Sequence, residues 1–338
     1  MRLRIMVRVG INGFGRIGRG VFRSGFNRAG FEIVAINDLS GPRTLAHLLQ
    51  YDSVHGKFEF PVQALKDELL VDGKKILNFT YKDPHQIPWQ DCGVDVVLEC
   101  TGLFKSKGEA AAHLRGSVKK VIISAPSSDA DLTLVRGVNE KSYDFKKHHV
   151  ISNASCTTNC LAPLVKVLHE NFKMLCASMT TVHSYTNDQR ILDVTHKDLR
   201  RARAAACSMI PTSTGATDAI VEVYPELKNK ISGLSVRVPT PCVSLVDLVA
   251  QVKEKVNIDQ VNALFEKESK GSLKGILGVC HEPLVSADFL GDPRSSILDI
   301  LLTQVIDGHH VKLVSWYDNE TGFSHRMVDL ALLVMKKS

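Results

Sequence analysis

The chain contains 338 residues, of which 44% are hydrophobic, 23% charged and 6% aromatic. At ~100–200 residues per domain, this length predicts two domains with ample material for a core. Apolar runs fall short of the ~18 residues of a membrane span, and the hydrophobic content argues against disorder. The net charge of +6 suits small anionic ligands but is spread too evenly for a nucleic-acid-binding protein. We therefore expect neither a membrane protein nor an obligatory nucleic-acid partner.

The eight cysteines show neither a Cys-x-x-Cys pair nor zinc-finger spacing, so we expect no metal site. Scattered cysteines without a secretory signal predict a reducing, cytoplasmic compartment. Residues 1–6 resemble the start of a signal peptide, but Arg8 and Gly10 interrupt it before an apolar region can form. We interpret this segment as a short extension that leads into a first strand.

The first half of the chain alternates β-branched runs with helical patterns. Strands are predicted at residues 7–11, 33–37, 94–99, 121–124 and 150–152. Between the first two strands, Ile17, Val21 and Phe22 lie at helical spacing. Strands separated by helices predict an α/β fold with a mainly parallel, doubly wound sheet.

The second half begins near residues 152–155 and shows longer, more alternating segments. These segments lie at residues 174–183, 231–239, 243–253 and 311–317. Such alternation predicts a mixed or antiparallel sheet with one covered face. Residues 322–335 then carry apolar side chains at helical spacing and predict a final amphipathic helix.

A Gly-x-Gly-x-x-Gly element lies between the first predicted strand and the first predicted helix. Its members are Gly13, Phe14, Gly15, Arg16, Ile17 and Gly18. Glycines at this spacing permit a tight turn and let the backbone approach a pyrophosphate at the helix N-terminus. A Gly-rich turn can also serve only to pack a strand against a helix. The succession of strand, turn, helix and second strand favours dinucleotide binding.

Asp38 ends the second predicted strand, 20 residues after Gly18. A carboxylate there accepts hydrogen bonds from an adenine ribose and repels a 2′-phosphate, which favours NAD over NADP. A helix-capping aspartate is the structural alternative.

Residues 152–160 place hydroxyl and amide side chains around Cys156 at the start of a helical pattern. Such side chains are typical of helix capping. A second interpretation places Cys156 in the first turn, where the helix dipole and free amides lower a thiol pKa from ~8.5 to roughly 3.5–7.5. Pro163 should bend this helix after about two turns. Cys160, one turn further on, is interpreted as structural.

A nucleophilic thiol needs a base, and His183 is the best placed of the thirteen histidines. It ends the predicted strand at residues 174–183 and precedes a polar segment at 184–188 of the kind that lines sites. Spacing alone does not separate a catalytic histidine from an ordinary one here.

The chain resembles the phosphorylating, glycolytic type of the glyceraldehyde-3-phosphate dehydrogenase family, in the same order from about Val7 to the C-terminus. The resemblance rests on residues 9–18, 155–160, 183–190 and 315–320. It implies a Rossmann-type NAD-binding domain at residues 1–154, completed by a C-terminal helix at 319–338. An α+β catalytic domain follows at 155–318. It also implies a homotetramer in which residues 188–208 approach a neighbour's cofactor site.

By this resemblance, Cys156 attacks the aldehyde of glyceraldehyde 3-phosphate, and His183 removes the thiohemiacetal proton as hydride passes to NAD. Inorganic phosphate then cleaves the thioester to 1,3-bisphosphoglycerate, and the reaction is reversible, serving glycolysis or gluconeogenesis. Beyond the glycine turn and Asp38, the resemblance implies cofactor contacts from Ser124, Tyr317 and Asn319.

The resemblance also assigns two phosphate sites, built from the hydroxyls, amides and guanidinium groups that phosphate needs. The substrate phosphate is assigned to Thr186 and Arg237, with Asp188 nearby. The incoming phosphate is assigned to Ser155, Thr157, Thr214, the Gly215 backbone and nearby Arg201. From pattern alone, residues 200–203 are more typical of a solvated charge run.

Some positions bear on cofactor choice. Leu39 suits the NAD-specific pattern, whereas Thr195 stands where strictly NAD-dependent members usually have proline. We therefore expect NAD as the preferred cofactor, with some use of NADP. Asp218 replaces a lysine often seen after the Thr214–Gly215 turn and has no assigned role.

Two alternatives to the main function remain. Erythrose-4-phosphate dehydrogenase shares the scaffold but departs from the His-Ser-Tyr-Thr-Asn-Asp pattern kept here at residues 183–188. An added role in binding nucleic acid or a surface ligand fits the net charge, but it lacks a basic stripe interleaved with aromatic residues.

Overall fold

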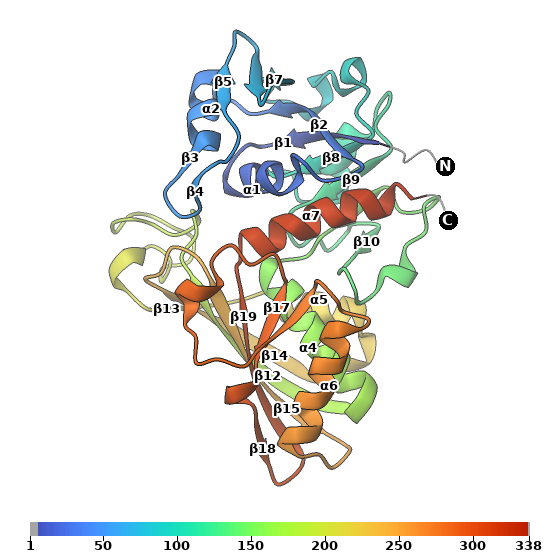
Figure 1. Ribbon diagram of the computed structural model, residues 1–338, viewed down its shortest axis with the longest axis vertical. Helices are drawn as coiled ribbons and strands as arrows, with labels where there is room; N and C mark the ends of the chain where they lie inside the picture. Colours follow the sequence, from blue (N-terminus) through green and yellow to red (C-terminus); the bar gives the residue numbers. More distant parts are fainter. Residues whose placement is uncertain (1–5, 337–338) are drawn as a thin grey trace. The chain divides into compact units, whose positions relative to one another are not determined.

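The computed structural model describes residues 6–336, and the chain divides into two compact units (Figure 1). The first unit comprises Met1–Ala154 and Ser324–Ser338, and the second comprises Ser155–Phe323. The predicted N-terminal extension lies outside the described residues except for Met6.

The first unit contains a nine-stranded sheet in the order β10-β11-β9-β8-β1-β2-β7-β6-β5. The six strands from β10 to β2 in this order are parallel to their neighbours. They are β1 (Val7–Asn12), β2 (Phe31–Asn37), β8 (Val96–Glu99), β9 (Lys120–Ile123), β10 (Leu132–Thr133) and β11 (Val150–Ser152). The chain leaves β1 toward β2 on one side and reaches β8 on the other, which confirms the predicted doubly wound sheet.

The sheet also continues beyond β2 with three strands that the sequence did not predict: β7 is parallel to β2, whereas the β7–β6 and β6–β5 pairs are antiparallel. Beside β2 lie β7 (Lys74–Phe79), β6 (Glu68–Val71) and β5 (Val62–Ala64), and a separate hairpin pairs β3 (Tyr51–Asp52) with β4 (Gly56–Lys57). These strands are short and half-exposed, and charged residues interrupt the apolar pattern of β6 and β7. A strand with so little buried surface gives only a weak signal in its sequence.

The first unit carries helices α1 (Arg16–Gly25), α2 (Pro42–Gln50) and α3 (Lys107–Ala110), with most of α7 (Thr321–Val334). Short 3₁₀ helices occupy Pro84–Gln86, Trp89–Cys92, Ala111–His113 and Glu140–Ser142. Helix α7 approaches α1 closely at Gly20, where a Cβ atom would lie 2.4 Å from Ser324 Oγ. At the far end of α7, the Tyr143 hydroxyl donates to the Val334 carbonyl at 2.7 Å.

The second unit contains an eight-stranded mixed sheet, as predicted. Its order is β13-β14-β12-β15-β19-β17-β16, with β18 paired to β19. The strands are β12 (Met174–Ser184), β13 (Ile210–Thr212), β14 (Ile231–Val238), β15 (Ser244–Val252), β16 (Leu277–Cys280), β17 (Ser296–Asp299), β18 (Gln304–Ile306) and β19 (His310–Tyr317). Strands β12 and β14 are parallel, whereas β12 and β15 are antiparallel.

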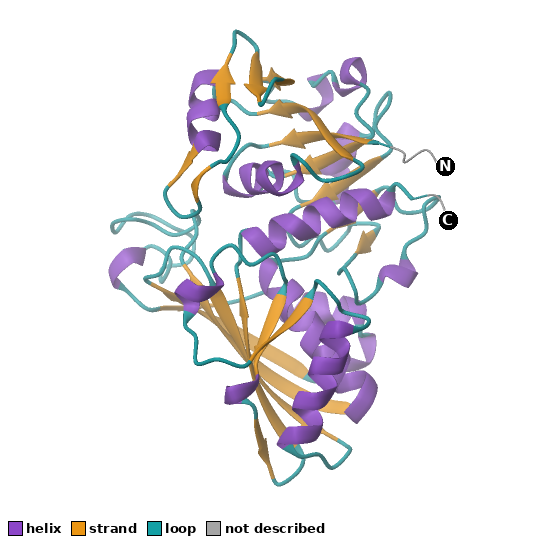
Figure 2. Cartoon of the chain, viewed as in Figure 1, coloured by secondary structure: helices purple, strands orange, loops and turns teal. Residues whose placement is uncertain are grey.

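Helices cover one face of this second sheet (Figure 2). They are α4 (Cys156–Phe172), α5 (Ala216–Val223) and α6 (Ile258–Lys270), and 3₁₀ helices lie at Ala205–Cys207, Pro225–Leu227, Ser286–Phe289 and Ile300–Leu302. Helix α4 continues through Pro163 to Phe172. Buried residues alternate along β15, as expected for a sheet with one covered face. The uncovered face exposes Leu234 and Val249.

Candidate active site

The turn between β1 and α1 shows why its sequence is rich in glycine. Gly13 has a φ of +88°, and a Cβ atom there would lie 2.6 Å from the Thr101 backbone nitrogen. A Cβ atom on Gly18 would lie 2.1 Å from the Gly13 carbonyl oxygen. Gly15, the N-cap of α1, has open space around its Cβ position and makes no side-chain cap. Ile17 follows in the first turn and is half-buried.

The amide groups at the start of α1 therefore suit a bound anion. The N-cap residue Gly15 supplies no capping side chain for this helix end. The helix dipole adds a partial positive charge at the same end. This cradle fits the pyrophosphate of a dinucleotide.

Asp38 is tied to this turn by its carboxylate. Its Oδ2 accepts a hydrogen bond from the Phe14 backbone nitrogen at 2.8 Å, and its Oδ1 accepts one from Ser40 at 2.9 Å. The N-cap of the following helix α2 is Gly41, so Asp38 does not cap that helix. The carboxylate is held beside the glycine turn, where it suits a ribose.

Three further predicted cofactor residues lie at this turn or at the carboxyl edge of the sheet. The Phe14 ring is buried edge-to-face against Phe22, with 5.7 Å between ring centroids, so its backbone is the part left for a ligand. Arg16 Nη1 lies 2.6 Å from Asp52 Oδ2 in an ion pair. Ser124 directly follows β9, at the carboxyl edge of the sheet where doubly wound folds bind ligands.

Cys156 is the first residue of α4. Ser155 is the N-cap, and its Oγ accepts a hydrogen bond from the Thr158 nitrogen at 3.0 Å. Ala154, just before, adopts a left-handed φ of +55°, which is costly for a residue with a Cβ atom. This sharp turn ends the preceding segment and starts α4, so the predicted first-turn position of Cys156 is confirmed.

His183 lies near the end of β12, on the face that α4 covers. Its side chain is 3% exposed, and its Nε2 lies 3.4 Å from Cys156 Sγ. The helix and the strand therefore bring together the two residues that the sequence singled out. This distance suits proton exchange between a thiol and an imidazole.

Burial controls the electrostatics of this pair. Burial first and the Arg237 charge second lower the pKa of His183 to about 3, so the imidazole is neutral near pH 7. Burial also raises the pKa of the Cys156 thiol, although Arg237 and hydrogen bonds around Thr157 act in the opposite direction. The predicted lowering of the Cys156 pKa is therefore wrong for this structure. Desolvation of the sulfur outweighs the Arg237 charge and these hydrogen bonds.

Cys160 has surroundings that suit a structural residue. It is fully buried, and its Sγ lies 3.7 Å from Ser296 Oγ and 3.8 Å from the Ser315 carbonyl. Burial raises its pKa to about 12, which leaves it protonated.

Tyr317 packs beside the Cys156–His183 pair. Its ring lies edge-on to the His183 ring, with 6.0 Å between centroids. Its hydroxyl lies 2.9 Å from the hydroxyls of Thr157 and Thr181. Tyr317 is 1% exposed, so its contacts support the base and the start of α4.

Asn319 is held by two buried serines that the sequence did not single out. Its Oδ1 accepts hydrogen bonds from Ser184 Oγ at 2.8 Å and from Ser244 Oγ at 3.0 Å. The two acceptor positions of the amide oxygen are therefore occupied, and the amide nitrogen is the end that can donate to a ligand.

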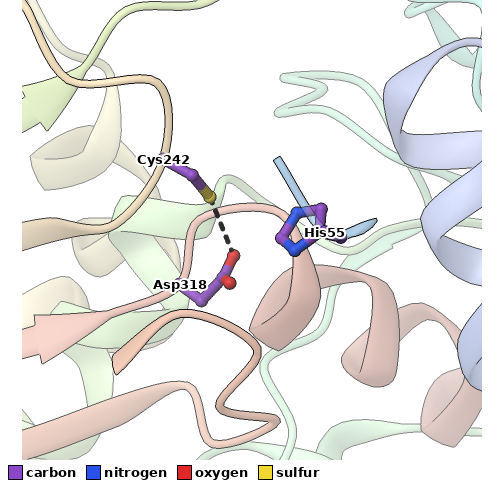
Figure 3. Close-up of side chains that lie close together, drawn as sticks. All are labelled: His55, Cys242 and Asp318. Carbon is purple, nitrogen blue, oxygen red and sulfur yellow. Dashed lines mark hydrogen bonds between the residues drawn. The ribbon is translucent and has the colours of Figure 1, made fainter. Parts of the chain in front are cut away.

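Asp318 shapes the turn that carries Asn319, and sequence reasoning missed it as well. Its Oδ1 accepts hydrogen bonds from the backbone nitrogens of Glu320 and Thr321, which form an Asx turn before α7. The thiol of Cys242 donates to the same oxygen at 3.2 Å (Figure 3). An aspartate just before a predicted helix is the signal that could have found it.

Arg237 and Thr186 belong to different groups of contacts. Arg237 lies on β14 opposite His183 on β12, and its Nη1 is 2.7 Å from His183 Nδ1. Thr186, just beyond β12, donates its backbone N–H to Gln189 Oε1 at 2.9 Å. Gln189 is a positioning contact that the sequence analysis did not identify.

Asp188 and Arg201 form an ion pair within a polar network. The Arg201 Nε donates to Thr212 Oγ1 at 2.9 Å, and Thr212 in turn donates to Asp198 Oδ2 at 2.7 Å. Arg201 is therefore a fixed cation, contrary to the pattern-based alternative of a solvated charge run. Arg203, which pairs with Asp193 in the open, does match that alternative.

The start of α5 is only partly capped. Gly215 is its N-cap without a side-chain hydrogen bond, and Thr214 Oγ1 accepts from the Ala216 nitrogen at 3.3 Å. Asp218 lies exposed in the first turn, where an acid is favourable toward the helix dipole. Its local role is thus explained without catalysis.

None of the helices between residues 6 and 336 combines the length and apolar character that a bilayer crossing requires.

The buried, neutral state of His183 predicts a pH-dependent stability. The folded pKa of about 3 lies below the ordinary value of 6.5, so between these pH values the unfolded chain binds a proton that the folded site does not. The free energy of unfolding should therefore fall as the pH drops from about 6.5 toward 3, by up to about 1.4 kcal/mol per pH unit. Urea unfolding at pH 7 and pH 5 measures this loss.

His183→Gln should lose less stability than the wild type between pH 7 and pH 5, since it removes the titrating group. His281→Gln, at an exposed histidine, serves as the matched control and should keep the wild-type difference. Equal losses in the wild type and His183→Gln would contradict the buried neutral state.

Comparisons with known proteins agree across the chain. The NAD-binding domain of glyceraldehyde 3-phosphate dehydrogenase matches residues 7–107, and the C-terminal domain of the same enzyme matches residues 155–319. The chain is 58% identical over 331 residues to glyceraldehyde-3-phosphate dehydrogenase from Geobacillus stearothermophilus, which covers 98% of this chain and 99% of the relative.

Two other relatives show the same correspondence. Glyceraldehyde-3-phosphate dehydrogenase 1 from Bacillus cereus is 58% identical over 332 residues, and that from Bacillus subtilis is 56% identical over 331 residues. Each alignment covers 98% of this chain and 99% of the relative. The resemblance inferred from four short motifs is thus confirmed over nearly the whole length, and the chain belongs to the glyceraldehyde-3-phosphate dehydrogenase family.

Proposed function

We propose that this chain carries out the reaction of its family through Cys156 and His183. The reaction is the reversible, NAD-dependent oxidation and phosphorylation of glyceraldehyde 3-phosphate to 1,3-bisphosphoglycerate, as used in glycolysis and gluconeogenesis. The observation that carries the proposal is the 3.4 Å contact between Cys156 Sγ and His183 Nε2 at the start of α4.

Cys156 forms the covalent bond to substrate. As its sulfur attacks the aldehyde carbon, the thiol proton passes through His183 Nε2 to the carbonyl oxygen, which becomes the hydroxyl of a thiohemiacetal. His183 then takes that hydroxyl proton back as the carbon loses a hydride, and a thioester results. NAD supplies the hydride acceptor when it is bound.

Inorganic phosphate completes the reaction at the same carbon. A phosphate oxygen attacks the thioester carbonyl, the Cys156 thiolate leaves, and His183 returns a proton to it. The Cys156 backbone amide, at the start of α4, and the His183 imidazole stabilise the oxyanion in both steps. A thioester at this point conserves the oxidation energy for transfer to phosphate.

We assign the phosphate-binding residues by the pattern of the family, and their chemistry supports the assignment. Thr186 and Arg237, with Asp188 nearby, bind the substrate phosphate. The incoming phosphate is bound by Ser155, Thr157, Thr214, the Gly215 backbone and Arg201. The fixed Arg201 guanidinium and the start of α5, whose N-cap Gly215 offers no side chain, support these assignments.

We assign cofactor binding to the glycine turn and Asp38, and to further residues elsewhere in the chain. Gly13, Gly15 and Gly18 let the backbone approach the pyrophosphate, and Asp38 binds the adenine ribose. Further contacts come from Phe14, Arg16, Ile17, Ser124 and Tyr317. The Asn319 amide nitrogen donates to the nicotinamide carboxamide, since its oxygen is already bound. The first unit thus serves NAD binding and the second serves the chemistry.

Exposed apolar residues support a homotetramer. In the segment at residues 188–208, Ile191, Leu192 and Leu199 are 85%, 75% and 81% exposed. The uncovered face of the second sheet adds Leu234 and Val249. Exposed apolar groups of this kind mark association surfaces.

A reducing, cytoplasmic location follows from the chemistry. Cys156 must remain a free thiol to attack the aldehyde, because its oxidation ends catalysis. The eight cysteines are all unpaired in the described residues.

A phosphate-dependent assay tests the proposed reaction. Purified protein with NAD and glyceraldehyde 3-phosphate should produce NADH continuously only when inorganic phosphate is present, because phosphate releases the acyl group from Cys156. NADH absorbance measures the rate. Erythrose 4-phosphate, assayed in parallel, should give a lower kcat/KM. Turnover that ignores phosphate would overturn the proposal.

The two cysteines of α4 should differ sharply on replacement. Cys156→Ser removes the thiol nucleophile and should lower kcat by at least roughly 1,000-fold. Cys160→Ser should retain most of the activity, because Ser296 and Ser315 can accept a hydrogen bond from the new hydroxyl. Steady-state kinetics on both variants check this. Comparable losses would remove the distinction between nucleophile and structural cysteine.

Cofactor preference should depend on the Asp38 charge. The wild type should show a higher kcat/KM with NAD than with NADP, since the carboxylate repels a 2′-phosphate. Asp38→Asn keeps an oxygen for the Phe14 N–H but removes the charge. It should lower the NAD-to-NADP ratio about tenfold, equivalent to ~1.4 kcal/mol. A wild type that prefers NADP would refute this assignment.

A further inference from the structure

A buried carboxylate that the proposed chemistry does not use lies at the carboxyl edge of the first sheet. Glu99 is the last residue of β8, and its side chain is 1% exposed. Asn12 and Asn37 end the neighbouring strands β1 and β2, and both are buried. His113, at the end of the 3₁₀ helix at Ala111–His113, is buried as well. Between residues 6 and 336, the partners of this carboxylate include neither lysine nor arginine.

The backbone of Tyr81 fixes the orientation of the two asparagine amides. Its N–H donates to Asn37 Oδ1 at 2.9 Å, and its carbonyl oxygen accepts from Asn37 Nδ2 at 3.0 Å. Since a backbone N–H only donates and a carbonyl only accepts, the Asn37 amide has one possible orientation. Asn37 Nδ2 also donates to Asn12 Oδ1 at 2.8 Å. The Asn12 Nδ2 therefore faces Glu99 and donates to its Oε2 at 2.5 Å.

Trp89 fixes the proton of His113 in the same way. The Trp89 indole N–H can only donate, and its nitrogen lies 3.1 Å from His113 Nδ1. A proton on Nδ1 would face the indole proton, so Nδ1 accepts and the ring carries its proton on Nε2. The Nε2–H donates to Glu99 Oε2 at 3.2 Å. Asn12 Nδ2 and His113 Nε2 lie 3.3 Å apart because both donate to this one oxygen.

The other carboxylate oxygen holds the chain that follows β8. Glu99 Oε1 accepts hydrogen bonds from the hydroxyl of Thr101 and from its backbone N–H, the latter at 2.8 Å. The Thr101 hydroxyl accepts in turn from the Leu103 N–H at 3.0 Å, which leaves its own proton for Glu99. Two donors on each oxygen match the acceptor capacity of one ionised carboxylate.

The backbone at Thr101 lies directly against the glycine turn. A Cβ atom on Gly13 would lie 2.6 Å from the Thr101 nitrogen and 2.7 Å from its Cα. The Gly13 N–H donates to the Asn37 carbonyl at 2.8 Å, and the Cys100 N–H donates to the Asn12 carbonyl at 2.7 Å. Both segments are therefore anchored to the residues whose side chains make up the buried network.

We propose that Glu99 is a positioning residue for NAD: its carboxylate fixes the backbone at Thr101 against Gly13 and so holds the glycine turn in the conformation that receives the pyrophosphate. The Glu99 carbonyl extends this effect to a second assigned cofactor residue, because it accepts the Ser124 N–H at 2.9 Å. The acceptor positions of the carboxylate are occupied, so Glu99 acts through the backbone and does not touch the cofactor. This inference rests on the NAD binding that is proposed above for the glycine turn.

A carboxylate is needed here because its partners are all donors. Glu99→Gln keeps the shape but replaces one acceptor oxygen by an NH₂ group. If this group faces Thr101, the hydroxyl and N–H of Thr101 lose their acceptor. If it faces the other way, Asn12 and His113 lose theirs. Buried donors without an acceptor are costly, so the segment at Thr101 should move away from Gly13 to find other partners.

The test separates NAD binding from the handling of the other substrate in the full chain. Glu99→Gln, freed of bound nucleotide, is titrated with NAD by calorimetry, and its kcat and both KM values are measured. The Kd and KM for NAD should rise about tenfold, equivalent to ~1.4 kcal/mol. The kcat at saturating NAD and the KM for glyceraldehyde 3-phosphate should change by less than about twofold. A general loss of structure would not separate the two substrates in this way.

Asp131→Asn is the matched control. Asp131 belongs to the same unit, and its Oδ2 accepts from the backbone N–H groups of His149 and Val150 at 2.7 and 2.8 Å. It also holds backbone through a carboxylate, but at the amino end of β11, the edge of the sheet opposite to the glycine turn. This variant should keep the wild-type Kd for NAD, even where urea unfolding shows a loss of stability like that of Glu99→Gln.

Thr101→Val tests the same link if Glu99→Gln does not fold. Valine keeps the β-branched shape but lacks the hydroxyl that donates to Glu99. The Kd for NAD should then rise about threefold, because the backbone N–H bond remains. Thr101→Ser retains the hydroxyl and should bind NAD like the wild type.

Two results would overturn the inference. One is an unchanged Kd for NAD in Glu99→Gln, or in Thr101→Val where Glu99→Gln does not fold. The other is a rise that Asp131→Asn shares, or that extends equally to the KM for glyceraldehyde 3-phosphate. Wild-type protein that does not bind NAD would refute the proposed function, and this inference with it, so the two failures are distinguishable.

Discussion

The burial of His183 beside Cys156 is the constraint on which the electrostatics of this site depend. The two side chains meet because α4 begins at Cys156 and β12 ends one residue after His183, on the face that the helix covers. Burial there disfavours charge on both groups, so it keeps the imidazole neutral and the thiol protonated. A neutral base and a protonated thiol can exchange one proton at 3.4 Å without creating an isolated buried charge.

Hydrogen bonds among the polar neighbours of the pair offset part of the free-energy cost of burying polar groups at this site. Tyr317 fixes two threonine hydroxyls, Thr157 on α4 and Thr181 on β12, and so ties the helix to the strand beside the site. Buried polar groups are tolerated when they are hydrogen-bonded, and such networks hold a single geometry. The positions of sulfur and imidazole are therefore set by contacts on both elements.

Much of this could be predicted from the sequence, and the failures have a physical pattern. The strand at Val150–Ser152 and the first-turn position of Cys156 follow from local burial patterns and capping residues. The strands β5, β6 and β7 were not predicted because they are short and half-exposed. The pKa of Cys156 was predicted in the wrong direction, because burial depends on elements far away in the sequence. The contact of Arg237 with His183 spans 54 residues and arises from strand register.

Ser184 contacts three of the candidate site residues, His183, Arg237 and Asn319. Its carbonyl oxygen contacts His183 Nδ1 and Arg237 Nη1, and its hydroxyl donates to the Asn319 oxygen. Since Ser184 is fully buried and its nitrogen also donates to Ser244 Oγ at 3.1 Å, it cannot move independently of its neighbours. The orientation of the base and that of the Asn319 amide are therefore linked through one backbone position. A change in how Arg237 contacts Ser184 therefore acts on the same residue that orients the Asn319 amide.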